Sequence, residues 1–304
     1  MTKFATGILF FSLSLILQYI WIKIQQKIHL TQQQKAYGVN IDVEIKSKTP
    51  SMGGVIFLVL GIFALIINFS EETLIFWSLP ILSGFVGFID DWLKFTSHSS
   101  EGLKSLSKLK MQLIICGLWV LIIFLTGNFG AWPIMIPVSF LMIAGTINAV
   151  NITDGLDGLS GGLSAIAFIA YALISFSVGF QDIGLFSLVL VGGLFGFLVY
   201  NTYPAKIFMG DTGSLALGAV MGAIAILTHR ELTLLVVAFI FVIETLSVIL
   251  QTFWVIVFKR KLFLMTPLHH HFEKLGWHEN DIVKLFWVAG LVLAMAGIIF
   301  GVWV

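Results

Sequence analysis

Short polar segments interrupt an otherwise apolar sequence, and the first carries two adjacent carboxylates. Asp90 and Asp91 are followed within one helical turn by Lys94, which can share a helix face with Asp90. Two neighbouring carboxylates repel each other, so they require a cation, a proton or a phosphate-bound metal nearby. The alternative interpretation is an interfacial charge cluster that ends a helix.

The second polar segment, Asn148–Gly162, contains two Asn, two Asp and one Thr among several glycines. Asp154 and Asp157 are spaced three residues apart, and the glycines beside them allow a backbone to approach a ligand closely. A turn in which Asp157 or Ser160 caps the next helix is the alternative. Because a cap needs only one such residue, the pattern favours a binding site.

The third segment, residues 201–214, begins with Asn201. Near its end Asp211 follows Gly210 and lies three residues before Ser214. Asp211 can cap the helix that follows. The beginning of a helix is also a natural place for phosphate, or for a metal bound to phosphate.

The fourth segment, Pro267–Glu273, contains His269, His270 and His271 in succession. Adjacent residues do not share a helix face, so all three do not fit one zinc ion. We expect one or two of them to hydrogen-bond a phosphate or a carboxylate. Glu244 precedes them inside an apolar run, where a charge costs about 2.5–3.5 kcal/mol, so it is either functional or held by a structural partner.

The composition places these segments in a membrane protein. Of 304 residues, 58% are hydrophobic and 11% are charged, whereas a soluble domain is about a quarter charged. Runs of about 20 apolar residues predict an all-α, polytopic protein with about ten transmembrane helices. The predicted spans, of which the ninth is long enough to tilt or kink, are Phe4–Ile24, Met52–Phe69, Thr73–Phe88, Leu109–Leu125, Trp132–Ala149, Gly161–Val178, Gly184–Tyr200, Asp211–Thr228, Leu232–Phe258 and Val283–Val304.

The distribution of charge predicts the orientation in the membrane. All but two of the 17 lysines and arginines, Lys3 and Arg230, fall in loops on one side of the predicted spans. The positive-inside rule makes that side cytoplasmic and places both termini on the extracytoplasmic side. The polar segments fall on the basic side. We therefore expect one transmembrane catalytic domain, residues 1–304, with its site in cytoplasmic loops at about 23–51, 89–108, 148–162, 201–214 and 259–282.

The residue types gathered on this side suit a charged phosphate chemistry. Carboxylates are the ligands that Mg²⁺ prefers, and lysines can hold the remaining phosphate charge. A site open to cytosol and to lipid predicts one soluble diphosphate substrate and one lipid substrate. An ion-coupled transporter is the rival from another class, but it would place acids near mid-bilayer, where only Glu244 lies.

The same motifs, with Phe208-Met209-Gly210-Asp211 and the opening Lys46-Ser47-Lys48-Thr49-Pro50-Ser51, resemble the polyprenyl-phosphate N-acetylhexosamine-1-phosphate transferases. The His-rich segment resembles in particular the branch of phospho-N-acetylmuramoyl-pentapeptide transferases. Ser51 stands where that branch is expected to have Thr, which preserves the hydroxyl. The nearest rival branch transfers GlcNAc-1-phosphate to the same lipid, and the Pro267–Glu273 segment argues against it.

The resemblance implies a Mg²⁺-dependent enzyme of the inner (cytoplasmic) membrane that is usually a homodimer. It would transfer phospho-MurNAc-pentapeptide from UDP-MurNAc-pentapeptide to undecaprenyl phosphate in the lipid bilayer and release UMP. No nucleic acid is expected as a partner. The product would be the first lipid-linked precursor of peptidoglycan, used for cell wall growth and division.

The resemblance also implies roles for particular residues. Asp211 would hold Mg²⁺, with Asp90 and Asp91 beside the lipid phosphate and the metal, and Phe208 would stack on uracil. His269 is taken as catalytic with the three aspartates. The remaining substrate-binding positions are expected at Lys46, Ser51, Lys94, Lys108, Asn148, Asp154, Asp157, Asn201, Glu244, His270 and His271.

Two reaction routes stay open at this stage. The lipid phosphate attacks directly, or an aspartate attacks first and forms a phospho-enzyme. The second pKa of a phosphate monoester is about 6, so near neutral pH the lipid phosphate has little proton for a base to remove. We therefore prefer direct attack, with Asp90 orienting the lipid phosphate or the metal; the relative roles of Asp90 and Asp91 stay open.

Overall fold

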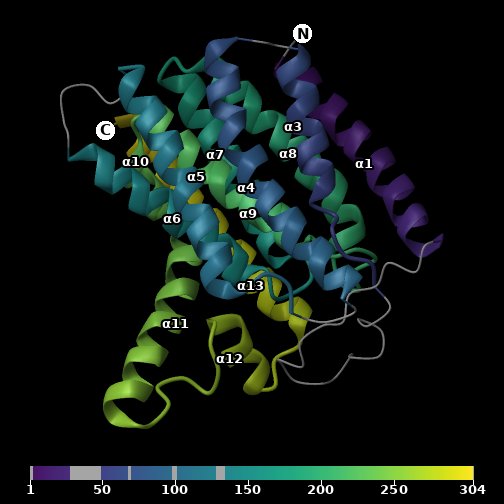
Figure 1. The fold of residues 1–304 in the computed structure, drawn as a ribbon, viewed down its shortest axis with the longest axis vertical. Coiled ribbons are helices and arrows are strands. Elements are labelled where there is room, and N and C mark those ends of the chain that lie inside the picture. Colours follow the sequence, from purple (N-terminus) through teal and green to yellow (C-terminus); the bar gives the residue numbers. More distant parts are fainter. Residues whose placement is uncertain (1–2, 28–48, 68–69, 98–100, 128–133, 304) are drawn as a thin grey trace.

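The computed structural model describes residues 3–27, 49–67, 70–97, 101–127 and 134–303, and the secondary structure of this part of the chain is a set of helices (Figure 1). In chain order the helices are α1 (Lys3–Lys27), α3 (Val55–Ile67), α4 (Glu71–Thr96), α5 (Ser105–Leu125), α6 (Met135–Thr153), α7 (Leu159–Ser177), α8 (Gln181–Asn201), α9 (Gly210–Leu227), α10 (Glu231–Val237), α11 (Phe239–Phe258), α12 (Leu268–Lys274) and α13 (Glu279–Trp303).

Nine of the helices in the described residues are long and apolar enough to cross a membrane. The described residues therefore form a multi-pass membrane protein built of helices, as the composition predicts. The second predicted span coincides with α3, which has 13 residues and is shorter than the other nine. The ninth predicted span, expected to tilt or kink, divides at Ala238 into α10 and α11.

Helix α11 extends away from the bundle, and the short helix α12 lies beside it (Figure 1), with His269 of α12 hydrogen-bonded to Glu244 of α11. Only Ile240, Phe241, Glu244 and Ser247 of α11 are buried, and all four lie in its first half. The start of α1 and the end of α13 lie at the end of the bundle opposite α12 (Figure 1).

Helix α9 forms the centre of the bundle and is buried along most of its length. Its small residues allow close packing: a Cβ added at Gly218 would lie 2.5 Å from the backbone oxygen of Thr146 on α6. Small residues at helix contacts are typical of membrane bundles, where van der Waals packing takes the place of the hydrophobic effect. This packing brings the beginning of α9 beside the carboxyl ends of α4 and α6.

Helix α4 is longer than the predicted third span. Its N-cap is Ser70, whose side chain accepts a hydrogen bond from the backbone N–H of Thr73 at 3.1 Å. It continues to Thr96, so Asp90, Asp91 and Lys94 belong to its last turns, beyond the predicted end of the span at Phe88. A helical backbone fixes the relative directions of these three side chains more firmly than a loop would.

Candidate active site

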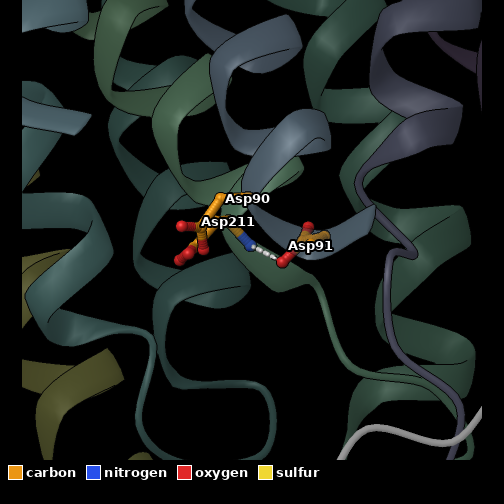
Figure 2. A group of neighbouring side chains, drawn as sticks. All are labelled: Asp90, Asp91 and Asp211. Carbon is orange, nitrogen blue, oxygen red and sulfur yellow. Dashed lines mark hydrogen bonds between the residues drawn. The ribbon is translucent and has the colours of Figure 1, made fainter. Parts of the chain in front are cut away.

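Three carboxylates meet where the end of α4 contacts the beginning of α9 (Figure 2). Asp90, Asp91 and Asp211 each offer an oxygen, and these atoms all lie within 4.8 Å of one another. Asp90 and Asp91 are almost completely buried, while 13% of the Asp211 side chain is exposed. The sequence segments that hold these residues lie far apart, and the structure joins them as predicted.

Asp91 holds the beginning of α9 in place. One of its oxygens accepts the backbone N–H of Asp211 at 3.1 Å, and the other accepts the N–H and the hydroxyl of Thr212 at 2.9 and 2.7 Å. The first N–H groups of a helix have no partner within the helix. A carboxylate from another helix can accept their hydrogen bonds, and its negative charge interacts favourably with the positive end of the helix dipole. Both oxygens of Asp91 are thus engaged in positioning Asp211.

The close approach of α4 and α9 depends on glycine. A Cβ added at Gly87 would lie 2.2 Å from the backbone oxygen of Asp211, and one at Gly210 would lie 2.6 Å from a carboxylate oxygen of Asp91. Gly210 also has a φ of +75°, in the left-handed region that L side chains rarely adopt. The turn before Asp211 therefore requires glycine for both space and conformation.

Two lysines neutralise the carboxylates. Lys94 Nζ lies 2.6 Å from Asp90 Oδ2 and 2.6 Å from Asp211 Oδ2, and Lys108 Nζ lies 2.7 Å from that same Asp211 oxygen. The other oxygen of Asp90 accepts the backbone N–H of Leu103 at 2.8 Å, which holds the segment before α5 against α4. Lys108, which matches the family motif only loosely, thus reaches the centre of the cluster.

The amide of Asn151 completes the surroundings of Asp211. Its Nδ2 donates to Asp211 Oδ1 at 2.6 Å and lies 2.8 Å from the hydroxyl oxygen of Ser214. The sequence places Asn151 inside a polar segment but does not show that it, rather than Asn148, faces Asp211. Asn148 instead donates to Gln112 on α5 and to the backbone oxygen of Ala144.

A second group of polar residues forms around the loop between α6 and α7. The buried Asp157 accepts the backbone N–H of Ala205 at 3.0 Å. The buried Asn201 accepts the N–H of Gly158 at 3.0 Å and donates to the backbone oxygen of Ile207 at 2.9 Å. Asp157 and Asn201 therefore join this loop to the segment between α8 and α9, as their predicted common site requires.

Asp154 lies between these two groups, directly after α6, and is half-buried. Burial, with the negative charges of Asp211 and Asp91 nearby, raises the pKa of its carboxyl group to about 8. In the absence of a cation Asp154 is therefore largely protonated at neutral pH and can donate a hydrogen bond.

Glu244 has a structural partner, and that partner is His269. The backbone N–H of His269 donates to Glu244 Oε1 at 3.1 Å, and its ring Nδ1 lies 3.1 Å from Glu244 Oε2. Both side chains are fully buried, and burial lowers the pKa of the His269 ring despite the carboxylate beside it. A Cβ added at Gly155 would lie 2.4 Å from His269 Nε2, so the imidazole packs directly against the 154–158 loop.

The other predicted residues lie further from the carboxylates. His270 pairs with Glu273 one turn along α12, and His271 Nδ1 accepts the N–H of Leu264 at 3.1 Å. The half-buried Phe208 donates its N–H to the backbone oxygen of Pro50 at 2.8 Å, so it lies beside the segment that contains Ser51. Lys46 lies outside the described residues.

Sequence reasoning did not single out Asn151, Thr212 and Glu279, all of which contact the site. Glu279 Oε1 accepts the backbone N–H of Asp157 at 2.7 Å. Thr212 is part of the motif Gly210-Asp211-Thr212-Gly213, where its position next to Asp211 is the available signal. Glu279 carries no signal because it begins a helix, where acidic residues are common for dipole reasons alone.

The donor atoms suit a hard divalent cation. The three carboxylates are ligands of the type that Mg²⁺ binds. Two ammonium groups already neutralise much of their charge, which leaves a site suited to a cation that arrives together with phosphate. The residues present therefore fit the ion that the family resemblance implies.

The fold and this site define a class of membrane-embedded transferase. Residues 73–229 match the model of glycosyl transferase family 4, and residues 46–58 match the first signature of phospho-N-acetylmuramoyl-pentapeptide transferases. The matched range includes all three carboxylates and both lysines of the cluster.

Curated proteins of the same name match nearly the whole chain. A phospho-N-acetylmuramoyl-pentapeptide transferase from Shouchella clausii is 42% identical over 97% of this chain and 96% of its own length. The protein of that name from Bacillus subtilis is 41% identical over 96% of each chain, and that from Staphylococcus carnosus is 38% identical over 98% and 99%. The chain belongs to the phospho-N-acetylmuramoyl-pentapeptide transferase family.

The cap that Asp91 provides can be tested by comparing Asp91→Asn with Asp90→Asn. An amide at position 91 keeps only one oxygen acceptor, so either the N–H of Asp211 or the two groups of Thr212 lose their partner, and we expect the free energy of unfolding to fall by about 2 kcal/mol. Asp90→Asn should lower the free energy of unfolding by clearly less, because two carboxylates then still face two lysines. Thermal unfolding in detergent measures both, and equal melting temperatures would contradict the capping role.

The buried pair of His269 and Glu244 predicts a pH dependence of stability. The pKa of His269 is lowered in the folded protein, so between that value and about 6.5 the unfolded state binds the proton more readily. This contribution to stability is present above about pH 6.5 and is lost as the pH falls through the folded pKa. The melting temperature of His269→Gln should therefore fall less between pH 7.5 and pH 5.5 than that of the wild-type protein. An equal fall in both proteins would show that other groups cause the pH dependence.

Proposed function

We propose that the protein transfers phospho-MurNAc-pentapeptide from UDP-MurNAc-pentapeptide to undecaprenyl phosphate and releases UMP. The observation that carries this proposal is the cluster of three carboxylates and two lysines at one end of a membrane-spanning bundle. The donor and acceptor both carry phosphate, so a site that balances acidic and basic groups suits them. The relatives that match almost the full chain carry the name of this activity.

Mg²⁺ is the proposed cofactor, held by Asp211 with Asp90 and Asp91 nearby. When bound, the ion would neutralise phosphate charge in the donor and in the leaving UMP. Because both oxygens of Asp91 are engaged by the beginning of α9, we assign Asp91 chiefly to holding Asp211 in place. Asp90, whose Oδ2 faces Lys94, remains to orient the lipid phosphate.

The proposed reaction is a direct displacement. An oxygen of the lipid phosphate forms a bond to the sugar-bearing phosphorus while that phosphorus loses its bond to the oxygen that leaves with UMP. Lys94 and Lys108 hold the phosphate charge that the two substrates bring together. Exchange of labelled UMP into the donor without lipid present would instead support a phospho-enzyme.

The remaining polar residues are proposed to bind the nucleotide, sugar and peptide. Phe208 would stack on uracil beside the loop that carries Asp154 and Asp157 and beside Asn201 at the end of α8. Lys46 and Ser51 are proposed as further substrate-binding residues. We propose that Glu244 acts by holding His269, the proposed catalytic histidine, against this loop. Asn148, His270 and His271 are proposed as further substrate-binding residues.

We further propose a homodimer in the inner membrane with about ten crossings, both termini outside and the site facing the cytoplasm. The basic residues gather in the loops at the site's end of the predicted spans, as the positive-inside rule requires. The start of α1 and the end of α13 at the same end of the bundle suit an even number of crossings (Figure 1).

UMP release by the purified protein in detergent tests the proposed function. We expect release with UDP-MurNAc-pentapeptide, undecaprenyl phosphate and Mg²⁺, loss of release on adding a chelator, and no release with UDP-GlcNAc. Asp211→Asn should lower the rate by at least about 100-fold and leave membrane insertion intact, because it removes a charge from the centre of the cluster.

Release with UDP-GlcNAc alone would move the protein to the sister branch. Substantial chelator-sensitive activity in Asp211→Asn would contradict the metal assignment. If folded protein releases no UMP with either donor, the result would favour an ion-coupled transporter.

A further inference from the structure

Helix α1 carries a polar stripe that the site described above does not use. Ser14, Gln18, Trp21 and Gln25 recur at helical spacing on one face, and Ser14, Gln18 and Gln25 are fully buried. Much of the rest of α1 exposes apolar side chains, including Phe4, Ile8 and Ile16, as a lipid-facing helix does. Buried amides in such a helix require hydrogen-bond partners.

Three side chains of the stripe, those of Gln18, Trp21 and Gln25, donate to three consecutive backbone carbonyl groups. Gln18 Nε2 donates to the oxygen of Gly53 at 2.9 Å, Trp21 Nε1 donates to that of Met52 at 3.1 Å, and Gln25 Nε2 donates to that of Ser51. Each donor is thus matched to one residue of the segment that precedes α3. Three side chains of α1 hold this segment along its length.

The same segment also forms backbone hydrogen bonds with the residues that directly precede α9. The N–H groups of Gly53 and Gly54 donate to the backbone oxygens of Phe208 and Met209 at 2.8 and 2.9 Å, and the N–H of Phe208 donates to Pro50. Phe208 and Met209 directly precede the turn that presents Asp211. The segment 50–54 therefore lies between α1 and the residues proposed to bind the base and the metal.

The backbone at Met52 shows that this arrangement is firmly held. Met52 has a φ of +65°, in the left-handed region that a residue with a side chain rarely adopts. A Cβ added at Gly210 would lie 3.2 Å from the nitrogen of Met52, so the unusual residue contacts the turn before Asp211. Such conformations persist only where surrounding contacts determine them, and Trp21 supplies one of those contacts.

The rotation of α1 is set by a close contact with α8. Cβ atoms added at Gly192 and Gly196 would lie 2.5 Å from the backbone oxygen of Gly7 and 2.6 Å from the Cβ of Ser14. The hydroxyl of Ser14 donates to the oxygen of Gly193 at 2.7 Å. Small residues four apart let two membrane helices approach closely, and here they direct the stripe toward residues 51–53.

We propose that Gln18, Trp21 and Gln25 are positioning residues for the nucleotide part of the donor substrate. They act through the 51–53 backbone on Phe208 and on the turn before Asp211, and do not touch the substrate themselves. This role rests on the proposed function. It assigns α1, which lies outside the matched range 73–229, to the working of the site.

Gln18→Met and Gln25→Met test the proposal, with Gln26→Met as the matched control. Methionine keeps the length of the side chain and removes the donor, and Gln26 is an exposed glutamine next to Gln25. The first measurement is amide hydrogen exchange at Gly53, Gly54 and Phe208 in the substrate-free protein. We expect exchange about tenfold faster in each variant and unchanged in the control.

The second measurement separates positioning from simple anchoring of α1. In Gln18→Met and Gln25→Met we expect KM for the uridine donor to rise about tenfold while KM for the lipid acceptor stays unchanged. Faster exchange with an unchanged donor KM would overturn the proposal, since α1 would then only anchor the segment. Unchanged exchange would overturn it as well.

Trp21→Phe serves if a glutamine variant does not fold, because it removes one N–H and keeps an aromatic ring. A wild-type protein without transferase activity would refute the proposed function. Hydrogen exchange at the three amides would still decide whether α1 holds the segment, because the exchange measurement needs no turnover. The affinity for UMP would then replace KM as the second measurement.

Discussion

The site depends on one interaction, the hydrogen bonding of the Asp91 carboxylate to the beginning of α9. A helix end inside a membrane bundle must satisfy its first N–H groups, and Asp91 does so from a neighbouring helix. The same contact fixes Asp211 next to Asp90, because Gly87 lets the two backbones meet. Three carboxylates so close together repel one another, and the ammonium groups of Lys94 and Lys108 offset that repulsion.

The turn before Asp211 is also where the other parts of the site converge. Asn201 and Asp157 fasten the loop after α6 to the segment that leads into α9, and the 50–54 segment pairs with Phe208 and Met209 from the other side. Backbone groups make most of these connections. A site held by such bonds is ordered before substrate binds, so the entropic cost of ordering the protein on binding is small.

Hydropathy alone predicts most of the fold, because about 20 apolar residues in a row have few alternatives to a membrane helix. It misplaces the end of α4, since Asp90 and Asp91 are polar residues that nevertheless continue a helix. The motifs predict which segments meet, but not which atoms: Asn151 rather than Asn148 contacts Asp211. The partners of Gln18 and Gln25 are backbone oxygens about 30 residues away, which no side-chain pattern reveals.

Binding of Mn²⁺ in place of Mg²⁺, followed by electron paramagnetic resonance with the uridine donor present, tests the central claim most directly. The claim is that α4 and α9 together form a divalent-cation site that works with the donor's phosphates. We expect wild-type protein to bind Mn²⁺ more tightly with donor than without it, and Asp211→Asn to lose this binding while Asp182→Asn, at the start of α8, keeps it. Undiminished Mn²⁺ binding in Asp211→Asn would contradict the account.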